Sequence, residues 1–277
     1  MTRPLSVGRS AKHGVLWLLG IGWLAPVYLV VANASKAPVD FDSTRVWQPP
    51  GTFALFENMH EAWASAGMGA SVFPTVLYSI VAPALSVLVG AAAGFGIVAL
   101  RLRAGLAWFM FIFSGIVFPL QMLLMPLFVG YAKIGIFDTR SGMILVYTAV
   151  GVPFAALVLR NYFSGIARTI YEAAVVDGAT NRQIFIRVYV PMSGNALLTV
   201  FLFQATSVWN DLLLGLVLTQ SPGVRPVMPA LTGLQGQYGG SSPPTMLAGA
   251  LLVSLPTVFL FLGAQRYFVR GLTLSQS

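Results

Sequence analysis

Few residues of this chain are of the types that perform catalysis or bind metal ions. It has two histidines, eight acidic residues and no cysteine, which excludes thiolate chemistry and disulfides. A nucleotide-binding P-loop needs a lysine followed by Ser or Thr, whereas the three lysines precede His13, Ala37 and Ile134. No Ser/His/Asp set is recognisable either. The sequence therefore predicts no catalytic residue, no metal site and no cofactor bound by this chain, which is not expected to be an enzyme.

The stretch with the most distinctive polar residues is 168–191. It is predicted to form two short helices with a bend at Asp177-Gly178, because Gly178 tolerates the positive φ of a sharp helix end. Thr180 or Asn181 can cap the second helix, and Pro191 suits the first turn of the helix that follows. The first helix places apolar Ile166, Ile170, Ala173 and Ala174 on one side, and the second places Ile184, Phe185 and Val188. Such a segment lies on a lipid surface or enters a groove on a partner.

The elements around this stretch are strongly apolar. The chain is 57% hydrophobic and 9% charged, against about 25% charge in soluble domains. A span needs about 20 apolar residues to cross about 30 Å of hydrocarbon, and backbone groups in lipid must pair internally. The qualifying stretches are 14–33, 72–100, 106–130, 142–162, 193–217 and 245–268. The fold is predicted to be all-α, a polytopic membrane protein with six transmembrane helices in one domain, 1–277.

The charge pattern predicts the orientation of the chain in the membrane. With an inner N-terminus, eleven of the sixteen basic residues fall on the inner side, which follows the positive-inside rule. They are Arg3, Arg9, Lys12, Arg101, Arg103, Arg160, Arg168, Arg182, Arg187, Arg266 and Arg270. The net charge of +8 therefore sets topology and predicts no nucleic-acid partner. Both termini are expected in the cytoplasm.

Polar residues within the apolar stretches are candidates for a substrate pathway. Asp211 is the only acid among them, and a carboxylate in the bilayer is costly. It either reaches the outer interface, caps the span against the adjacent loop, or lines a pathway. The other candidates for that lining are Gln121, Gln204, Trp209 and Asn210. Pro119 and Pro126 predict a kink in the third span. Long outer loops are predicted at 34–71 and 219–244.

The stretch Glu172-Ala173-Ala174-x-x-Asp177-Gly178-Ala179, followed by Phe185 and Pro191, resembles the cytoplasmic EAA loop of ABC importer permeases. The resemblance extends over most of 72–273 and is greatest to the carbohydrate branch of that family, in particular to the smaller permease of maltose-type systems. Residues that carry it include Gly135-Ile136-Phe137-Asp138-Thr139, Trp209-Asn210-Asp211 and Gln265-Arg266-Tyr267. Ile166-Ala167 departs from the family, which often has Ile-Pro there.

The resemblance implies a set of partners. They are a second homologous permease, two ATPase subunits that bind ATP and Mg, an extracytoplasmic sugar-binding protein and the lipid bilayer of the bacterial cytoplasmic membrane. The coupling loop, about 163–191, would place Glu172, Ala173, Ala174, Asp177, Gly178, Ala179, Phe185 and Pro191 at the ATPase. Gln235, Gly236, Gln237 and Tyr238 would contact the binding protein. The expected function is that of a permease subunit of an ATP-driven sugar importer.

Two other functions remain open at this point. An ion-coupled secondary transporter would be driven by a gradient, but such carriers usually place ionisable residues deep in their spans, where this chain has almost none. A structural membrane scaffold would lack any pathway lined by Gln121, Gln204 and Asn210.

Overall fold

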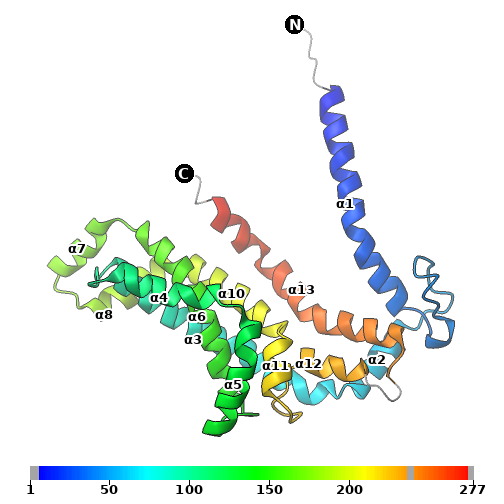
Figure 1. Ribbon diagram of the computed structural model, residues 1–277. Coiled ribbons are helices and arrows are strands. Elements are labelled where there is room, and N and C mark those ends of the chain that lie inside the picture. Colours follow the sequence, from blue (N-terminus) through cyan, green and yellow to red (C-terminus); the bar gives the residue numbers. More distant parts are fainter. Residues whose placement is uncertain (1–5, 236–239, 274–277) are drawn as a thin grey trace. The chain divides into compact units, whose positions relative to one another are not determined.

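The computed structural model describes residues 6–235 and 240–273 and confirms the all-α prediction. In these residues the only strand-like pairing is an isolated bridge between Lys36 and Phe53. The elements, drawn in Figure 1, are α1 (Ser6–Ala34), η1 (Pro38–Asp40), α2 (Leu55–Ser65), α3 (Met68–Val98), α4 (Gly105–Val117), α5 (Leu120–Ile134), α6 (Arg140–Ser164), α7 (Arg168–Val176), α8 (Asn181–Ile184), η2 (Phe185–Tyr189), α9 (Val190–Met192), α10 (Gly194–Trp209), α11 (Leu213–Leu218), α12 (Val227–Thr232), η3 (Gly233–Gln235) and α13 (Pro243–Thr273).

Four described helices are long and apolar enough to cross a membrane, and two bent helix pairs raise the number to six if each pair is one span. The four are Lys12–Ala34, Met68–Val98, Arg140–Ser164 and Pro243–Gly263. The bent pairs are Gly105–Val117 with Leu120–Ile134, and Asn181–Met192 with Gly194–Trp209. All six predicted stretches therefore have a counterpart. The fifth is shorter than predicted, because its helix ends at Trp209 and α11 is separate.

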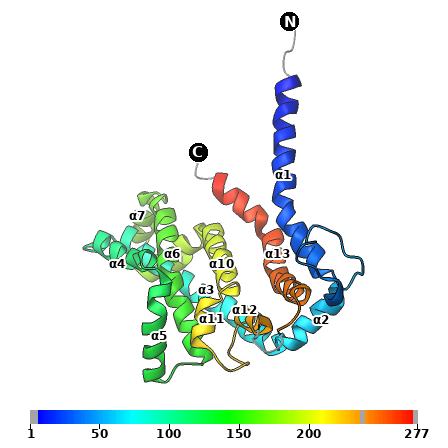
Figure 2. The same cartoon turned by 45° about the vertical axis from the view of Figure 1, so that its right-hand side comes forward.

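The predicted kink in the third span is a break. α4 and α5 meet at 94° (Figure 2). Phe118 has an extended backbone, as expected for a residue before a proline, and Pro119, which has no N–H to donate, is the N-cap residue of α5. Pro126, by contrast, lies inside α5 without ending it. Pro119 thus separates α4 from α5, whereas α5 continues through Pro126.

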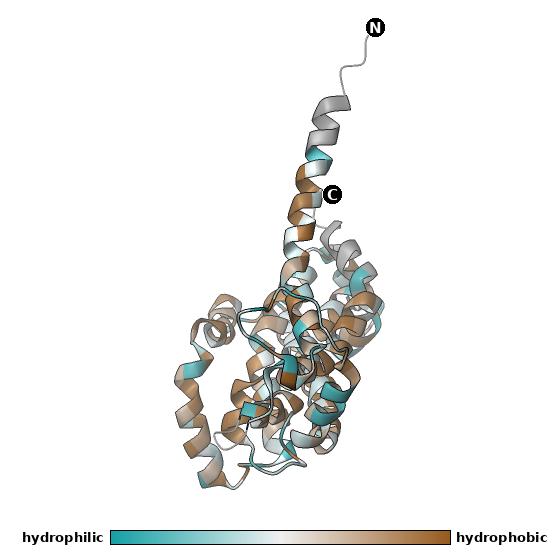
Figure 3. Ribbon diagram, turned by 90° about the vertical axis from the view of Figure 1, so that its right-hand side faces the viewer, coloured by the Kyte–Doolittle hydropathy of each residue, from teal (hydrophilic) through white to brown (hydrophobic). Residues whose placement is uncertain are grey.

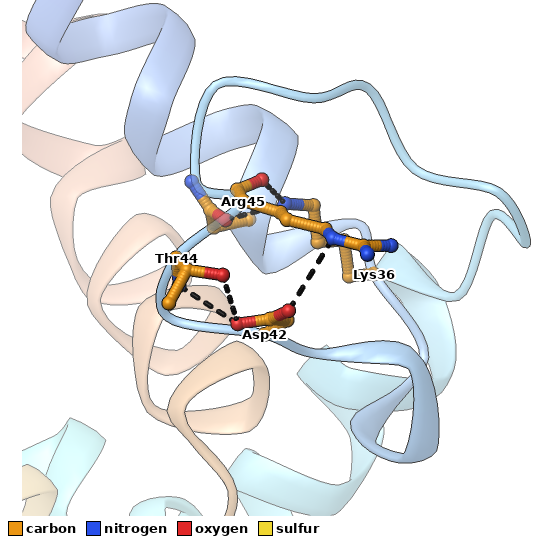
Figure 4. Close-up of polar contacts among 5 residues, drawn as sticks. Lys36, Asp42, Thr44 and Arg45 are labelled. Atoms are coloured by element: carbon orange, nitrogen blue, oxygen red, sulfur yellow. Dashed lines mark hydrogen bonds and ion pairs between the residues drawn. The ribbon is translucent and has the colours of Figure 1, made fainter.

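The chain falls into two compact groups of residues: those up to Gly67 with Leu231–Leu255, and Met68–Ala230 with those from Pro256 on. The prediction of a single permease domain over 1–277 stays a prediction. In the first group, Lys36 is buried and donates from Nζ to Asn33 Oδ1 (2.9 Å) and the Arg45 carbonyl (2.8 Å), as Figure 4 shows. Asn58 Nδ2 donates to the carbonyls of Ala34 and Lys36, both at 2.8 Å. These bonds join the end of α1 to α2.

From Lys12 on, the side chains of α1 are mostly exposed. Trp23, for example, is 81% exposed, and Figure 3 shows apolar residues along the helix. A helix with this composition requires lipid or another protein around it. Near its end, Asp42 accepts hydrogen bonds from the hydroxyl and N–H of Thr44, which lower the pKa of Asp42 below its usual value. The loop after α1 is therefore held by its own polar contacts.

In the second group, α3 and α6 approach closely because glycines face α6. A Cβ on Gly90 would lie 2.6 Å from Ala155 Cβ, and one on Gly94 would lie 3.0 Å from the Arg160 nitrogen. Small residues allow this approach between membrane helices. One apolar cluster, which includes Phe95, Leu159 and Phe163, lies toward the C-terminal ends of both helices. A second, with Tyr78 and Tyr147, lies toward their N-terminal ends.

We predict that Gly90→Ala lowers the melting temperature of the purified chain, because the added methyl group forces α3 and α6 apart. Overpacking of this kind costs about 1–3 kcal/mol. Gly130→Ala is the matched control, since nothing lies within 4 Å of a Cβ built there. It is expected to leave the melting temperature unchanged or to raise it. Equal melting temperatures for the two variants would contradict the close approach.

Candidate functional site

The stretch singled out by the sequence forms the predicted pair of short helices. α7 ends at Val176, and Gly178 has φ +78° at the bend. The Gly178 N–H donates to the Val175 carbonyl and the Ala179 N–H to the Ala174 carbonyl, both at 3.0 Å. These bonds end α7 with Gly178 in the left-handed backbone conformation, which favours glycine. The prediction of a sharp bend at Asp177-Gly178 is confirmed.

The second helix begins with a capping box. Thr180 Oγ1 accepts from the Gln183 N–H, and Gln183 Oε1 accepts from the Thr180 N–H at 2.8 Å. Thr180, and not Asn181, is therefore the cap. Asn181 Oδ1 instead accepts a hydrogen bond from the Tyr171 hydroxyl at 2.9 Å. This bond joins α8 to α7 across the bend.

One face of the loop is buried against α3 and α6. Ile184 and Tyr189 are buried. The ring of Phe95, on α3, lies 5.2 Å from that of Phe185 and 4.9 Å from that of Tyr189. Phe163, on α6, lies 5.4 Å from Tyr189. The loop is thus packed on the C-terminal ends of α3 and α6, the two helices with the most extensive mutual contact.

The sequence identified Ile184, Phe185 and Val188 on this face but missed Tyr189. Helical periodicity of 3.6 does not place residue 189 beside residue 184. Residues Phe185–Tyr189 form a π-helical turn, η2, in which residues five apart align. An apolar pair at spacing five is the signal that reveals it.

The opposite face of the loop is exposed and carries most of the predicted coupling residues. Glu172, Ala173, Asp177, Gly178 and Pro191 are exposed. Ala174 and Ala179 are half-buried against the apolar cluster, as is Phe185, so these three face the helix bundle. Pro191 lies in α9, before α10 begins at Gly194.

Two exposed valines extend the outward face of α7. Val176 is 86% exposed and Val175 is 48% exposed. They follow Glu172 by four and three residues, so they lie on the same side of the helix. Large exposed apolar side chains beside small ones favour contact with another protein. The sequence argument did not single them out, although their spacing from Glu172 indicates their position.

Gln204, a predicted pathway residue, is buried within the helix packing. It accepts a hydrogen bond from the Ser86 hydroxyl and donates from Nε2 to the Gly151 carbonyl at 3.0 Å. It therefore connects α10 to α3 and α6. Gln121, on α5, is exposed instead. In this structure the two glutamines do not line a common space.

The break after α10 brings together Trp209, Asn210 and Asp211. Asp211 Oδ2 accepts from the Tyr147 hydroxyl (2.9 Å) and from the Gly215 N–H (3.1 Å). Of the alternatives open for Asp211, this arrangement favours a cap, here of the first turn of α11. Asn210 Nδ2 donates to the Thr206 carbonyl at 2.8 Å and is 3.4 Å from Thr257 Oγ1.

Trp209 lines a cavity of about 200 Å³ between α3, α10 and the part of α13 that follows Leu255. Its other lining residues include Ser79, Phe201 and Pro256. Most of these side chains are apolar, so the cavity offers few groups that would bind a polar solute. It does not by itself define a substrate site.

The outer loop at 219–244 is only partly described. Gln235 ends η3 and is exposed, whereas the predicted binding-protein contacts Gly236, Gln237 and Tyr238 lie outside the described residues. The first part of the loop is held by Asp138, which accepts hydrogen bonds from the N–H of Gln220 (2.8 Å) and the hydroxyl of Ser221 (2.5 Å). Burial acts to raise the pKa of Asp138, but these bonds and Arg225 outweigh it and lower that pKa.

The described residues contain no group of three or more His, Asp or Glu side chains placed to hold a metal ion. What the arrangement offers is mechanical: an exposed, stiff helical hairpin on the ends of two tightly packed membrane helices.

Comparison with known proteins identifies the family. Residues 86–274 match the model of the binding-protein-dependent transport system inner membrane component. The chain belongs to this family. Its members are transport components of membranes, and the matched residues include the whole hairpin.

Individual relatives agree with this assignment. The chain is 33% identical over 216 residues to the osmoprotective compounds uptake permease GgtD of Synechocystis, covering 78% of this chain and 72% of that protein. It is 28% identical to the glucose import system permease GlcU of Saccharolobus solfataricus, covering 98% and 95%. It is 32% identical to the alpha-glucoside transport system permease AglG of Rhizobium meliloti, covering 80% and 60%.

A solved structure shares the fold. It is a chain from a crystal structure of a bacterial ABC transporter involved in the import of the acidic polysaccharide alginate. The TM-score is 0.77 at 24% identity, and the match covers 96% of this chain and all of that one. The permease fold is therefore shown by the backbone as well as by the sequence.

We predict that Gln204→Met lowers the melting temperature, because it keeps the side-chain volume but loses the bonds to Ser86 and Gly151. Hydrogen bonds between membrane helices average about 0.6 kcal/mol and reach about 1.7 kcal/mol. Gln121→Met makes the same change at an exposed position and is expected to have no effect. A Gln204→Met variant with parental stability would contradict a role in packing.

Proposed function

We propose that this chain is a permease subunit of an ATP-driven, binding-protein-dependent sugar importer. In this proposal it forms the substrate pathway with a second homologous permease and is coupled to two ATPase subunits through the loop at about 163–191. The observation that carries the proposal is the hairpin of α7 and α8. Its exposed face presents Glu172, Ala173 and Gly178, while its other face is fixed to α3 and α6.

A stiff hairpin suits the transmission of force. ATP binding would close the ATPase pair and shift the bound hairpins, and the ring contacts of Phe95 with Phe185 and Tyr189 would carry that shift into the membrane helices. Dense packing transmits strain, since cores have discrete arrangements and little compressibility. ATP and Mg would be bound by the partner subunits, and this chain would hydrolyse nothing itself.

The sugar assignment is supported by the relatives. AglG and GlcU are described as permeases for alpha-glucosides and glucose, and MelC of Bacillus subtilis as a permease for melibiose, raffinose and stachyose. GgtD, however, is described as taking up osmoprotective compounds. We therefore infer a neutral sugar or a related polyhydroxylated solute. We place the chain in the bacterial cytoplasmic membrane with both termini inside, as its basic residues favour.

The test is co-expression of the tagged chain with the genes beside its own. Co-purification of a second permease and an ATPase is expected, with ATP hydrolysis stimulated by the binding protein loaded with one sugar of a panel that contains glucose, maltose, raffinose and glycerol 3-phosphate. ATP-dependent accumulation of that sugar in proteoliposomes completes the test. Gradient-driven uptake by the chain alone would overturn the proposal in favour of an ion-coupled carrier.

We predict that Gly178→Val reduces ATP-driven uptake without reducing the amount of chain in the membrane. A β-branched residue at φ +78° strains the bend by about 1–3 kcal/mol. If that strain is felt in the rate-limiting step, the rate of uptake falls by about 5- to 150-fold. Gly178→Asn is the matched control, because asparagine tolerates this conformation, and a Cβ there meets nothing within 4 Å. Uptake should fall only for valine. Parental uptake in Gly178→Val would contradict the role of the bend.

A further inference from the structure

Arg168, the first residue of α7, contacts the end of α3 and two residues of its own helix. Its Nη1 donates to the Ala99 carbonyl at 2.5 Å, and its Nε lies 3.2 Å from Glu172 Oε1. Its guanidinium lies 4.3 Å from the centre of the Tyr171 ring. Arginine has several donors in one rigid plane, so a single side chain can serve all of these partners together.

The Ala99 carbonyl is a special acceptor. α3 ends at Val98, and the last carbonyls of a helix have no partner within the helix. They also form the negative end of the helix dipole, where a cation is favoured. The chain turns away directly afterwards, with positive φ at Arg101 and Ala104. The local N–H groups of Leu100 and Leu102 donate to Phe95 and Gly96, whereas the Ala99 carbonyl receives its donor from Arg168, 69 residues away.

We propose that Arg168 is the joint through which movement of the coupling loop is passed to α3. The inference rests on the proposed function, because only a loop that is moved by a partner has movement to pass on. Arg168 is a positioning residue in this proposal: it touches neither substrate nor nucleotide. It fixes the position of the exposed face of α7 relative to the end of α3.

The other contacts between the loop and α3 cannot do this alone. The rings of Phe185 and Tyr189 pack on Phe95, and apolar contacts have little directional preference. A hydrogen bond from a charged group is directional and stronger than a neutral one. The rings therefore hold the loop against α3, and Arg168 determines its register along α3.

The arrangement on α7 places the joint next to the docking face. Glu172 is one turn from Arg168 with its side chain 61% exposed. An exposed ion pair at this spacing contributes little stability by itself. The Tyr171 hydroxyl donates to Asn181 on α8, so the ring under the guanidinium is itself held. Arg168 thus contacts both the exposed carboxylate of Glu172 and the end of α3, and Tyr171 connects it to α8.

The absence of cysteine from the sequence allows a direct test by spin labelling. Thr169→Cys on α7 and Ala92→Cys on α3, both exposed positions, report the distance between the loop and α3, and neither residue is among those assigned to the docking face. Double electron–electron resonance is recorded on the complex with its partners, with and without ATP, using an ATPase that cannot hydrolyse it.

With Arg168 present, the distance distribution is expected to be the same in both states, because the loop and α3 move together. In Arg168→Ala it should broaden or shift on addition of ATP. A distance distribution in Arg168→Ala that matches the parent both with and without ATP would contradict the proposed role of Arg168. So would a distribution in the parent that shifts with ATP.

Function gives the second readout. Arg168→Ala should keep the ATPase bound and hydrolysis within about 2-fold of the parent, while the sugar accumulated per ATP falls by about 2- to 30-fold, the range of coupling carried by single residues. Arg168→Lys retains one charged donor and should restore part of this ratio. Arg182→Ala removes a positive charge from the same loop without touching α3 and should keep the parental ratio. An unchanged ratio in Arg168→Ala would refute the proposal.

The two proposals fail in different ways. If the parent chain binds no ATPase, the proposed function is contradicted, and the proposed role of Arg168 is contradicted with it. A parent complex that couples ATP to uptake, together with an Arg168→Ala complex that couples equally well, defeats the joint alone.

Discussion

The close approach of α3 and α6 is the constraint on which the rest of the structure depends. Gly90 and Gly94 bring the two helices together, and a side chain at Gly90 would collide with Ala155. At their C-terminal ends this separation brings Phe95 and Phe163 near enough for Tyr189 to pack against both. Nearer their middle it lets Gln204 reach Ser86 and Gly151 at once. The positions of the α7–α8 hairpin and of the helices in the bundle therefore depend on the same spacing between α3 and α6.

This arrangement explains how an element with little apolar surface can hold a fixed position. α7 and α8 contain thirteen residues between them, nine and four, and isolated helices of that length are marginal in water. Here three of the four ends are fixed by a named contact: Thr180 and Gln183 cap the start of α8, Gly178 closes the end of α7, and Arg168 at the start of α7 reaches α3. Stiffness comes from these tertiary contacts and not from helix propensity.

The sequence predicted elements better than it predicted what their polar residues do. The apolar stretches, the bend at Gly178 and the kink near Pro119 depend on local chemistry, and all are present. The lining role expected for Gln204 stays a prediction, because it depends on which side of α10 faces a pathway, and periodicity does not determine that side when a helix is apolar all round. A glutamine inside the membrane can also form its hydrogen bonds with neighbouring helices. Its polar character alone therefore does not distinguish a residue that lines a pathway from one that joins helices.

The π-helical turn at Phe185–Tyr189 has a consequence for how the hairpin can vary. Such a turn holds one more residue than an α-helical turn of the same rise. Loss of one residue would rotate everything before it by about 100° relative to α10. Ile184 would then leave its buried position while Tyr189 kept its own. Substitutions on the exposed face are compatible with this geometry, whereas an insertion or deletion in the π-helical turn is not. Related chains are therefore expected to conserve the number of residues in this segment more strictly than their identities.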